Sequence, residues 1–302
     1  MNVNFPLTSA RKIGGTLQQR EAIWGLFFVA PAVIYFSIFW IYPLLNAFYI
    51  SFTNWDLFSS PSFVGLKNYQ RLLGHGDFHQ SVKATLYFAI GNAIPVPIIS
   101  LVLALLVNRK FHGRDFFRTA FFIPAVTSWI AASIVWRLIY MPNAGLYLLF
   151  VQPFGVHEIK WLTSREWAMP AIIILSIWKS VGPNMVIFLA GLQNMPEEVF
   201  EAARVDGANN WQTLWRITLP LLKPTTLFVM VMLLIGAFQV FTPVYVMTRG
   251  GPANVTRVLP MFLYQEGFAF YRMGSASAVS VMMFLAVLTL TVVQLRFFRE
   301  RD

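Results

Sequence analysis

The stretch "EVFEAARVDGANNWQTLWRITLPLLKPT", residues 198–225, lies between two long apolar blocks and is itself too polar to cross a membrane. Just before it, Asn194 and Glu197 resemble a capping box in which asparagine replaces serine or threonine. Proline is tolerated in a first helical turn, and acidic side chains suit the positive end of the helix dipole. A first short helix is therefore predicted over Pro196–Val205.

A turn and a second helical piece follow. The dipeptide Asp206-Gly207 predicts the turn, because glycine adopts positive φ at little cost. The second piece is expected over Asn210–Thr218, and Pro220 ends or kinks it. Residues 194–224, called the polar insert below, thus form two short helices joined at a glycine. Such a pair suits docking on another protein or lying on a bilayer surface, and the residues alone leave both alternatives open.

The composition around the insert is that of a membrane protein. Of the 302 residues, 57% are hydrophobic and only 12% are charged, whereas about 25% are charged in a typical soluble domain. The net charge of +10 is distributed between apolar blocks, so we expect no nucleic-acid partner. The absence of cysteine excludes disulfides, thiolate catalysis and thiolate metal sites.

Six apolar blocks are long enough to span a bilayer, which takes about 20 mostly apolar residues. The first is too long for the apolar region of a signal peptide and is predicted to be a retained helix. The expected fold is an all-α polytopic membrane protein that forms one permease-like domain over residues 1–302. Its spans are predicted at about residues 24–46, 84–107, 120–140, 169–192, 226–247 and 276–295.

Lysine and arginine indicate the orientation of these spans. With the N-terminus inside, 13 of the 23 basic residues fall in inner segments and 8 in outer segments. The bias is strongest in "NRKFHGRDFFR", residues 108–118, after the second span. Both termini and the polar insert are therefore predicted to be cytoplasmic.

The insert also contains a spaced set of small, apolar and acidic residues: Glu201, Ala202, Ala203, Gly207, Ile217, Leu219 and Pro220. This set resembles the EAA signature of the permease subunits of bacterial binding-protein-dependent ABC importers, with agreement at every signature position. Residues 188–225 are similar to the carbohydrate-uptake subgroup in particular. Leu214 departs from that subgroup, which often has an aromatic residue there.

The resemblance extends over nearly the whole chain. Residues 63–73, "FVGLKNYQRLL", are similar to a segment typical of the first permease of a heterodimeric pair, and residues 250–284 resemble the last outer loop and final helix of the subgroup. The resemblance implies the type I importer permease fold in a bacterial inner membrane. It also implies a second permease subunit, a cytoplasmic ABC ATPase dimer that binds ATP and Mg²⁺, and an extracytoplasmic protein that delivers a sugar or related polyol.

In such a complex the permease is no enzyme, and it requires no cofactor in its own chain. Its coupling helices lie in a cleft of the ATPase and transmit ATP-driven motion to the spans. By this resemblance, Glu201 meets basic groups of the ATPase and Gly207 allows the bend. The residues implied in ATPase coupling are Glu201, Ala202, Ala203, Asp206, Gly207, Ile217, Leu219 and Pro220.

Polar residues inside spans often mark a transport pathway. The candidates that the sequence offers are Gln239, Tyr245, Asn184, Lys179 and Arg137, with Asn92 as a further one. Gln239 and Tyr245 are the preferred sugar contacts, because sugars favour hydrogen bonds and stacking on aromatic rings. For Arg137 the alternative is snorkelling at the end of its span.

Lys179 lies in "SIWKSVGPNM", residues 176–185, which contains both a glycine and a proline. Its alternative role is to bind exposed backbone carbonyls. The glycine and the proline have two interpretations, a broken helix that lines a cavity or an adjustment that serves packing.

Other chemistries have little support. His75 and His79 have a spacing that binds metals on a helix, but the glycines around His75 argue against a helix there, so no metal site is predicted. The sequence has no phosphate-binding loop of the G-x-x-x-x-G-K-[ST] type and no catalytic constellation. The alternative function is a self-sufficient ion-coupled carrier or channel, which the scarcity of intramembrane carboxylates disfavours.

Overall fold

The computed structural model describes residues 14–109, 111–141 and 160–299. It is almost entirely helical, with one small two-stranded sheet in the described part. Four helices are long and apolar enough to cross a membrane, and two bent helix pairs raise the number to six if each pair is one span. The predicted all-α polytopic fold is therefore confirmed. The ends of the chain lie outside the described residues, as do four of the 13 basic residues assigned above to inner segments: Arg11, Lys12, Lys110 and Arg301.

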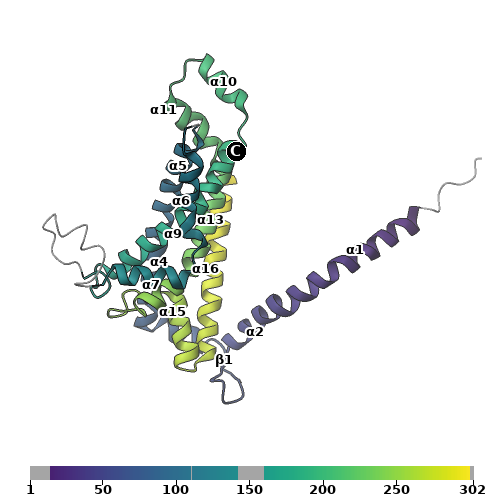
Figure 1. The fold of residues 1–302 in the computed structure, drawn as a ribbon. Coiled ribbons are helices and arrows are strands. Elements are labelled where there is room, and N and C mark those ends of the chain that lie inside the picture. Colours follow the sequence, from purple (N-terminus) through teal and green to yellow (C-terminus); the bar gives the residue numbers. More distant parts are fainter. Residues whose placement is uncertain (1–13, 110, 142–159, 300–302) are drawn as a thin grey trace, which may run out of the picture.

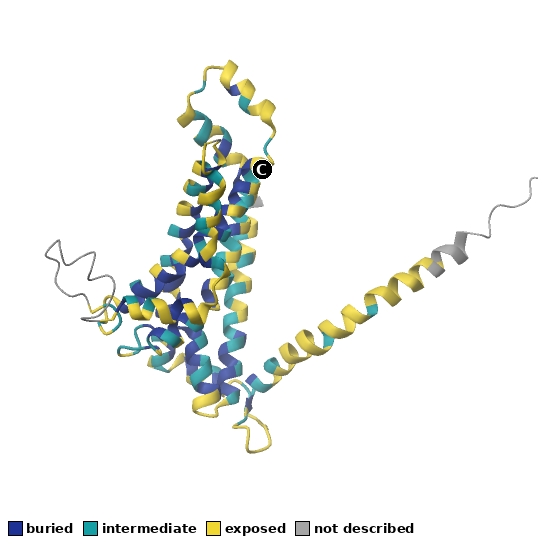
Figure 2. Cartoon of the chain, viewed as in Figure 1, coloured by how far each residue is buried: buried dark blue, intermediate teal, exposed yellow. Residues whose placement is uncertain are grey.

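The first apolar block forms an arm that leaves the helical bundle (Figure 1). It consists of α1 (Gly14–Phe36), a π-helical turn η1 (Ser37–Ile41) and α2 (Tyr42–Ser51). None of its most apolar 18-residue window is buried within the chain, and Figure 2 shows most of the described part of the arm exposed, up to its end near the bundle. Only the end of α2 packs on the bundle, where Phe48 contacts Phe284 with ring centroids 6.0 Å apart. The arm is thus an apolar helix that the rest of this chain does not cover.

The second and third apolar blocks fold differently from each other. The second is nearly continuous, as α4 (Gly76–Ala93) and α5 (Pro95–Asn108), which together form one candidate span. The third, predicted as one span, is two helices, α6 (Arg114–Val126) and α7 (Trp129–Ile139), bent by 99°. Thr127 and Ser128 are extended at the bend, and the Ser128 hydroxyl caps α7 by accepting from the Ala131 N–H at 3.1 Å.

The fourth block is one continuous helix, α9 (Ala168–Gln193), which runs through both Gly182 and Pro183. A Cβ atom on Gly182 would lie 2.0 Å from the carbonyl oxygen of Phe121 in α6. The glycine therefore allows the backbones of α6 and α9 to touch. The broken-helix interpretation of this block is wrong, because the glycine serves packing between helices.

The polar insert and the fifth block are joined by a bend of 63°. Pro224 lies in the first turn of the helix that follows, where a missing N–H is harmless. Beyond a second break at residues 239–241 the chain reaches the last long helix, α16, which runs the length of the bundle (Figure 1). The elements from the insert onward are α10 (Glu197–Val205), α11 (Asn210–Thr213), η3 (Leu214–Thr218), α12 (Leu219–Leu221), α13 (Lys223–Phe238), α14 (Thr242–Met247), α15 (Leu259–Tyr264), η4 (Gln265–Ala269) and α16 (Met273–Arg299).

The end of the bundle opposite the insert, called the far end below, contains the remaining elements. Strands β1 (Thr53–Asn54) and β2 (Ser62–Phe63) pair antiparallel, and the short helix α3 (Lys67–Leu73) follows. The Asn68 amide donates to the carbonyls of Ser51 and Thr53 at 2.8 Å each. These bonds fix the strands to α3 next to the start of α16.

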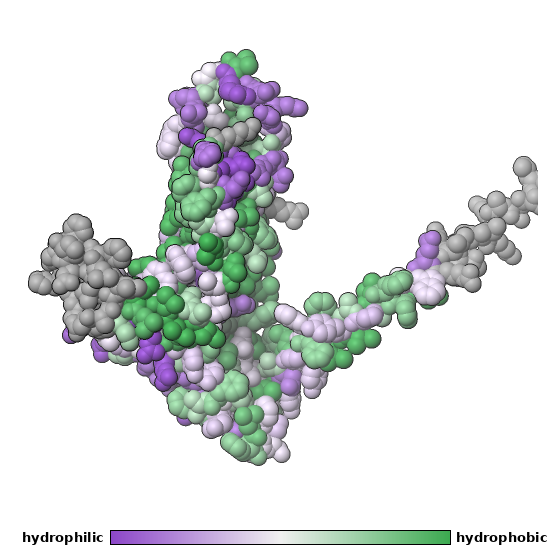
Figure 3. All heavy atoms as spheres, in the orientation of Figure 1, coloured by the Kyte–Doolittle hydropathy of each residue, from purple (hydrophilic) through white to green (hydrophobic). Residues whose placement is uncertain are grey.

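The buried core runs between the bundle helices in three clusters. One lies around Phe88 and Ile172, a second around Phe188 and Leu222, and a third at the far end around Phe262. Figure 3 shows hydrophilic side chains gathered over the polar insert and apolar ones along the visible face below it. This arrangement places the insert outside the apolar zone of the molecule.

Candidate functional site

Two regions carry the residues singled out from the sequence, and the first is the polar insert. Helix α10 ends in a Schellman motif, in which the Ala208 N–H donates to the Ala203 carbonyl at 2.9 Å and the Gly207 N–H to the Arg204 carbonyl at 3.2 Å. Gly207 has φ of +76°, as predicted for the joint. The backbone there is left-handed, a conformation that glycine adopts without strain.

Helix α10 displays its acidic residues to solvent. Glu197 and Glu198 occupy its first turn. The Glu201 side chain is 63% exposed, and its carboxylate lies 3.7 Å from the Arg204 guanidinium. An ion pair this exposed contributes little to stability, so the carboxylate remains available to another partner. Of the two alanines, Ala203 is buried and Ala202 is exposed.

The capping box predicted at Asn194 is wrong. Asn194 still has helical backbone angles, and its N–H donates to the Ala190 carbonyl at the end of α9. It therefore cannot start a new helix, and Pro196 precedes α10 instead, without a side-chain cap. The capping box of the insert is found at the second helical piece, between Asn209 and Gln212. The same side-chain chemistry occurs there in a segment that follows a turn rather than a helix.

The second piece of the insert connects to the bundle. Thr218 and Leu222 are buried, and Leu222 belongs to the core cluster around Phe188. Ile217 and Leu219 are half-buried, whereas Pro220 is exposed just before the 63° bend. The insert is thus fixed to the membrane part through this short segment, while α10 stands clear of the bundle (Figure 1).

The second region is a cavity of about 370 Å³ in the bundle. It lies where helix breaks meet, next to the start of α7 and the gap between α13 and α14. Its described lining contains no ionisable side chain; it combines hydroxyl and amide groups with three aromatic rings and several aliphatic side chains. Such a surface can hydrogen-bond and stack against an uncharged polyhydroxylated molecule. The residues that carry this chemistry are Asn92, Trp129, Ser176, Ser180, Gln239, Phe241 and Thr242.

The structure does not bring the predicted pathway residues together. Gln239 lines the cavity, at the end of α13 where the helix breaks. Tyr245 is not part of the lining, and its ring stacks on that of Phe241 with the centroids 5.3 Å apart. The Asn184 amide donates to the Ser180 carbonyl of its own helix at 2.8 Å. Arg137 is exposed and borders a different cavity near the end of α7.

Lys179 has the alternative role given above, because it binds exposed backbone carbonyls and does not line the pathway. It is 6% exposed, and its ammonium group donates to backbone carbonyls at the break between α6 and α7. Its side chain is not among those that line the cavity. Sequence reasoning missed Ser176 and Ser180, although two hydroxyls four residues apart mark one face of a helix. It also missed Trp129, for which the local signal was Ser128, a residue type that favours the start of a new helix.

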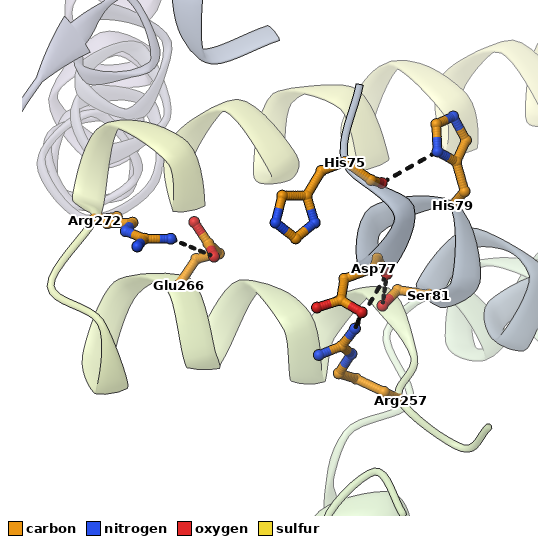
Figure 4. Close-up of polar contacts among 7 residues, drawn as sticks. All are labelled: His75, Asp77, His79, Ser81, Arg257, Glu266 and Arg272. Carbon is orange, nitrogen blue, oxygen red and sulfur yellow. Dashed lines mark hydrogen bonds and ion pairs between the residues drawn. The ribbon is translucent and has the colours of Figure 1, made fainter. Parts of the chain in front are cut away.

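The far end holds a cluster of charged residues that the sequence did not single out (Figure 4). The Arg257 guanidinium lies 2.7 Å from the Asp77 carboxylate, and the buried Glu266 carboxylate lies 3.5 Å from Arg272. His75 precedes α4 with an extended backbone, and the Nδ1 of His79 is 3.1 Å from the His75 carbonyl. The two histidine rings therefore do not share one helical face, and the described residues contain no group of three or more metal-binding side chains.

Comparison with known sequences identifies a close family resemblance. The sequence profile described as "Binding-protein-dependent transport system inner membrane component" matches residues 83–301. The arabinooligosaccharides transport system permease protein AraP of Bacillus subtilis is 35% identical over 272 residues, which cover 89% of this chain and 86% of that protein. The trehalose/maltose transport system permease protein MalF of Thermococcus litoralis is 33% identical over 290 residues, which cover 94% of this chain and 97% of that protein.

A solved structure has the same fold. It is described as a bacterial alginate ABC transporter in complex with an alginate pentasaccharide-bound periplasmic protein. One of its chains matches with a TM-score of 0.81 and 23% identity, over 92% of this chain and 94% of that one. At this identity the likeness concerns the arrangement of the helices.

Proposed function

We propose, from the premise that this chain belongs to the binding-protein-dependent transport system inner membrane components, that it forms the path of an ATP-driven sugar importer. The chain is a multi-pass membrane component of a transport system and not an enzyme. The observation that carries the proposal is the placement of the glycine-jointed insert outside the apolar bundle, on a short segment that leads into a candidate span.

The insert is proposed to transmit the motion of a separate ATPase, which would hold the ATP and Mg²⁺. The exposed Glu201 carboxylate suits a basic partner, and the Gly207 joint orients α10 away from the bundle. Ile217, Leu219 and Pro220 would pass that motion to α13 across the bend. Exposed acids on a small helix, fixed at one end, favour docking over a merely surface-bound loop.

Two further partners are proposed. The apolar arm formed by α1 and α2 is uncovered by this chain and would pack on a second permease subunit and lipid. The relative of known structure is described in complex with a periplasmic protein, and we assign the far end of the bundle to such a protein. The insert end, where Arg114, Arg118 and Arg216 lie, would then be cytoplasmic together with both termini, in line with the bias of basic residues.

The proposed substrate is an uncharged oligosaccharide or related polyol. The cavity offers amides, hydroxyls and aromatic faces without an ionisable group in its described lining. Anionic sugars would have no cation to pair with there, because the nearby Lys179 ammonium is engaged by carbonyls. Two relatives are named for arabinooligosaccharides and for trehalose and maltose, which agrees with this chemistry.

Replacing Gln239 by alanine is expected to lower maximal uptake of the sugar roughly 3- to 10-fold, the effect of losing about one hydrogen bond to the substrate. Asn184→Ala is the matched control, since that amide bonds to its own helix, and it should keep uptake within about twofold. Uptake of labelled oligosaccharide per amount of assembled complex measures both. Equal losses in the two variants would remove Gln239 from the pathway.

The proposed function itself is tested by reconstitution. The chain is assembled in liposomes with a candidate second permease, ATPase and binding protein from the same organism, and uptake is compared with that of a complex whose ATPase cannot hydrolyse ATP. Uptake should require the active ATPase. Transport by the chain without an ATPase, driven by an ion gradient, would instead support the carrier alternative.

A further inference from the structure

The sharp bend between α6 and α7 leaves backbone groups that need partners. The last four carbonyls of any helix have no hydrogen bond within the helix. Here α6 ends at Val126, and the chain turns by 99° within two residues. The exposed carbonyls are costly in an apolar environment unless a donor reaches them.

Lys179 supplies that donor from the middle of α9. Its Nζ donates to the carbonyls of Pro124 at 2.9 Å, Ala125 at 3.3 Å and Thr127. An ammonium group has three N–H donors, which matches three acceptors. The carboxyl end of a helix also carries partial negative charge, so a cation is favoured there. A buried lysine is thereby compensated by backbone dipoles, and three carbonyls at the bend gain a donor, although the Pro124 carbonyl also accepts from the Thr127 hydroxyl at 2.7 Å.

A second contact fixes the same two helices one turn farther along α9. Because Gly182 has no side chain, the Phe121 carbonyl of α6 can contact the backbone of α9. A Cβ atom on Gly182 would lie 2.0 Å from that carbonyl oxygen. Helix α6 is thus held on α9 at its body by close packing and at its end by Lys179. The direction in which the chain leaves the bend depends on the contact with Lys179.

Trp129 is the first residue after the bend. The Lys179 ammonium lies 5.1 Å from the centre of its ring, within the range of a cation–π interaction. The same ring lines the cavity together with Gln239 and Ser180. The ammonium group therefore contacts both the end of α6 and the residue that α7 presents to the cavity.

We propose that Lys179 is a positioning residue, which holds the bend between α6 and α7 so that Trp129 forms a wall of the cavity. Its effect on uptake rests on the proposed function, whereas its effect on the Trp129 ring does not. The residue acts through Trp129 and not by binding the sugar, because its N–H groups are already engaged.

The first test is spectroscopic and needs no substrate. The assembled complex is labelled with 5-fluorotryptophan in this chain, and the Trp129 resonance is assigned from the Trp129→Phe variant. Lys179→Gln and Lys179→Met should each shift or broaden that resonance. If Lys179→Met prevents assembly of the complex, the milder Lys179→Gln variant alone decides the test. Ser100→Ala is the matched control, because it removes a buried 3.0 Å hydrogen bond from α5 to Val181 on the same helix without touching the bend. An unmoved Trp129 resonance in Lys179→Gln, or an equal shift in Ser100→Ala, would overturn the proposal.

The second test is a double-mutant cycle on uptake. Lys179→Gln and Trp129→Leu should each lower maximal uptake roughly 5- to 10-fold, and the double variant should be no slower than Trp129→Leu alone. Such non-additivity is expected if the lysine acts through the ring. If the fold-losses of the two single variants instead multiply in the double variant, Lys179 acts independently of Trp129. If all forms are inactive while the fluorine signals change as expected, the proposed function fails and the positioning role stands.

Discussion

Gly207→Pro is expected to uncouple ATP hydrolysis from uptake and to lower uptake by roughly 100-fold. Gly207 has φ of +76°, whereas proline is restricted to φ near −65°, and the conflict costs about 3 kcal/mol or more. That free energy corresponds to about two orders of magnitude in an equilibrium constant. Proline also removes the Gly207 N–H that bonds to the Arg204 carbonyl at 3.2 Å. Stimulation of the ATPase by sugar-loaded binding protein, measured in the reconstituted complex, is the direct readout.

The control for this variant is Gly207→Asn, since asparagine tolerates left-handed backbone better than other residues. No atom lies within 4 Å of a Cβ at this position, so asparagine should fit and retain most of the stimulation. Glu201→Lys tests the docking role separately by reversing an exposed charge, with Glu201→Gln as its milder counterpart. Unchanged stimulation in both Gly207→Pro and Glu201→Lys would contradict the coupling role of the insert.

Gly182→Ala is expected to destabilise the bundle strongly. The added methyl group would lie 2.0 Å from the Phe121 carbonyl oxygen and 3.0 Å from the Phe122 Cα. These are backbone atoms, so α6 and α9 must separate and the bend at Thr127 must move with α6. Overpacking typically costs about 1–3 kcal/mol and sometimes more, and contact with backbone places this variant at the upper end. The free energy of unfolding in detergent, or the temperature at which the complex loses its monodisperse elution, measures the loss.

Gly236→Ala is the matched control for this prediction. It also replaces a helical glycine in a membrane segment, but no atom lies within 4 Å of its added Cβ. Alanine has a higher helix propensity than glycine by roughly 1 kcal/mol, so this variant should be at least as stable as the parent chain. Equal destabilisation of the two variants would show that the contact between α6 and α9 does not limit stability.

Much of this protein is determined locally, and the sequence by itself predicts those parts. Apolar length predicts helices that can span a membrane, because every backbone group in lipid must bond within its own segment. The Gly207 joint and the limits of α10 follow from turn and helix chemistry within a few residues. The spacing from Glu201 to Pro220 indicates the family for the same reason, as it is a pattern along one short segment.

Other features depend on residues that meet only in the folded chain. The capping signal at Asn194 was wrong because the preceding helix extends to Gln193, and helix ends respond to packing as well as to local chemistry. Ser128 is a local signal for the start of α7, but no local feature sets the angle of the bend at Thr127. It depends on Lys179, 52 residues farther along the chain, and on the glycine that lets α6 touch α9.

The same distinction applies to the cavity. The sequence identified polar residues within apolar blocks, yet it could not separate Gln239, which lines the cavity, from Asn184, which bonds to its own helix. A polar side chain in a membrane segment must find a partner, and several partners are always within reach of its rotamers. Which partner it takes is decided by the positions of the neighbouring helices, and those positions exist only in the tertiary structure.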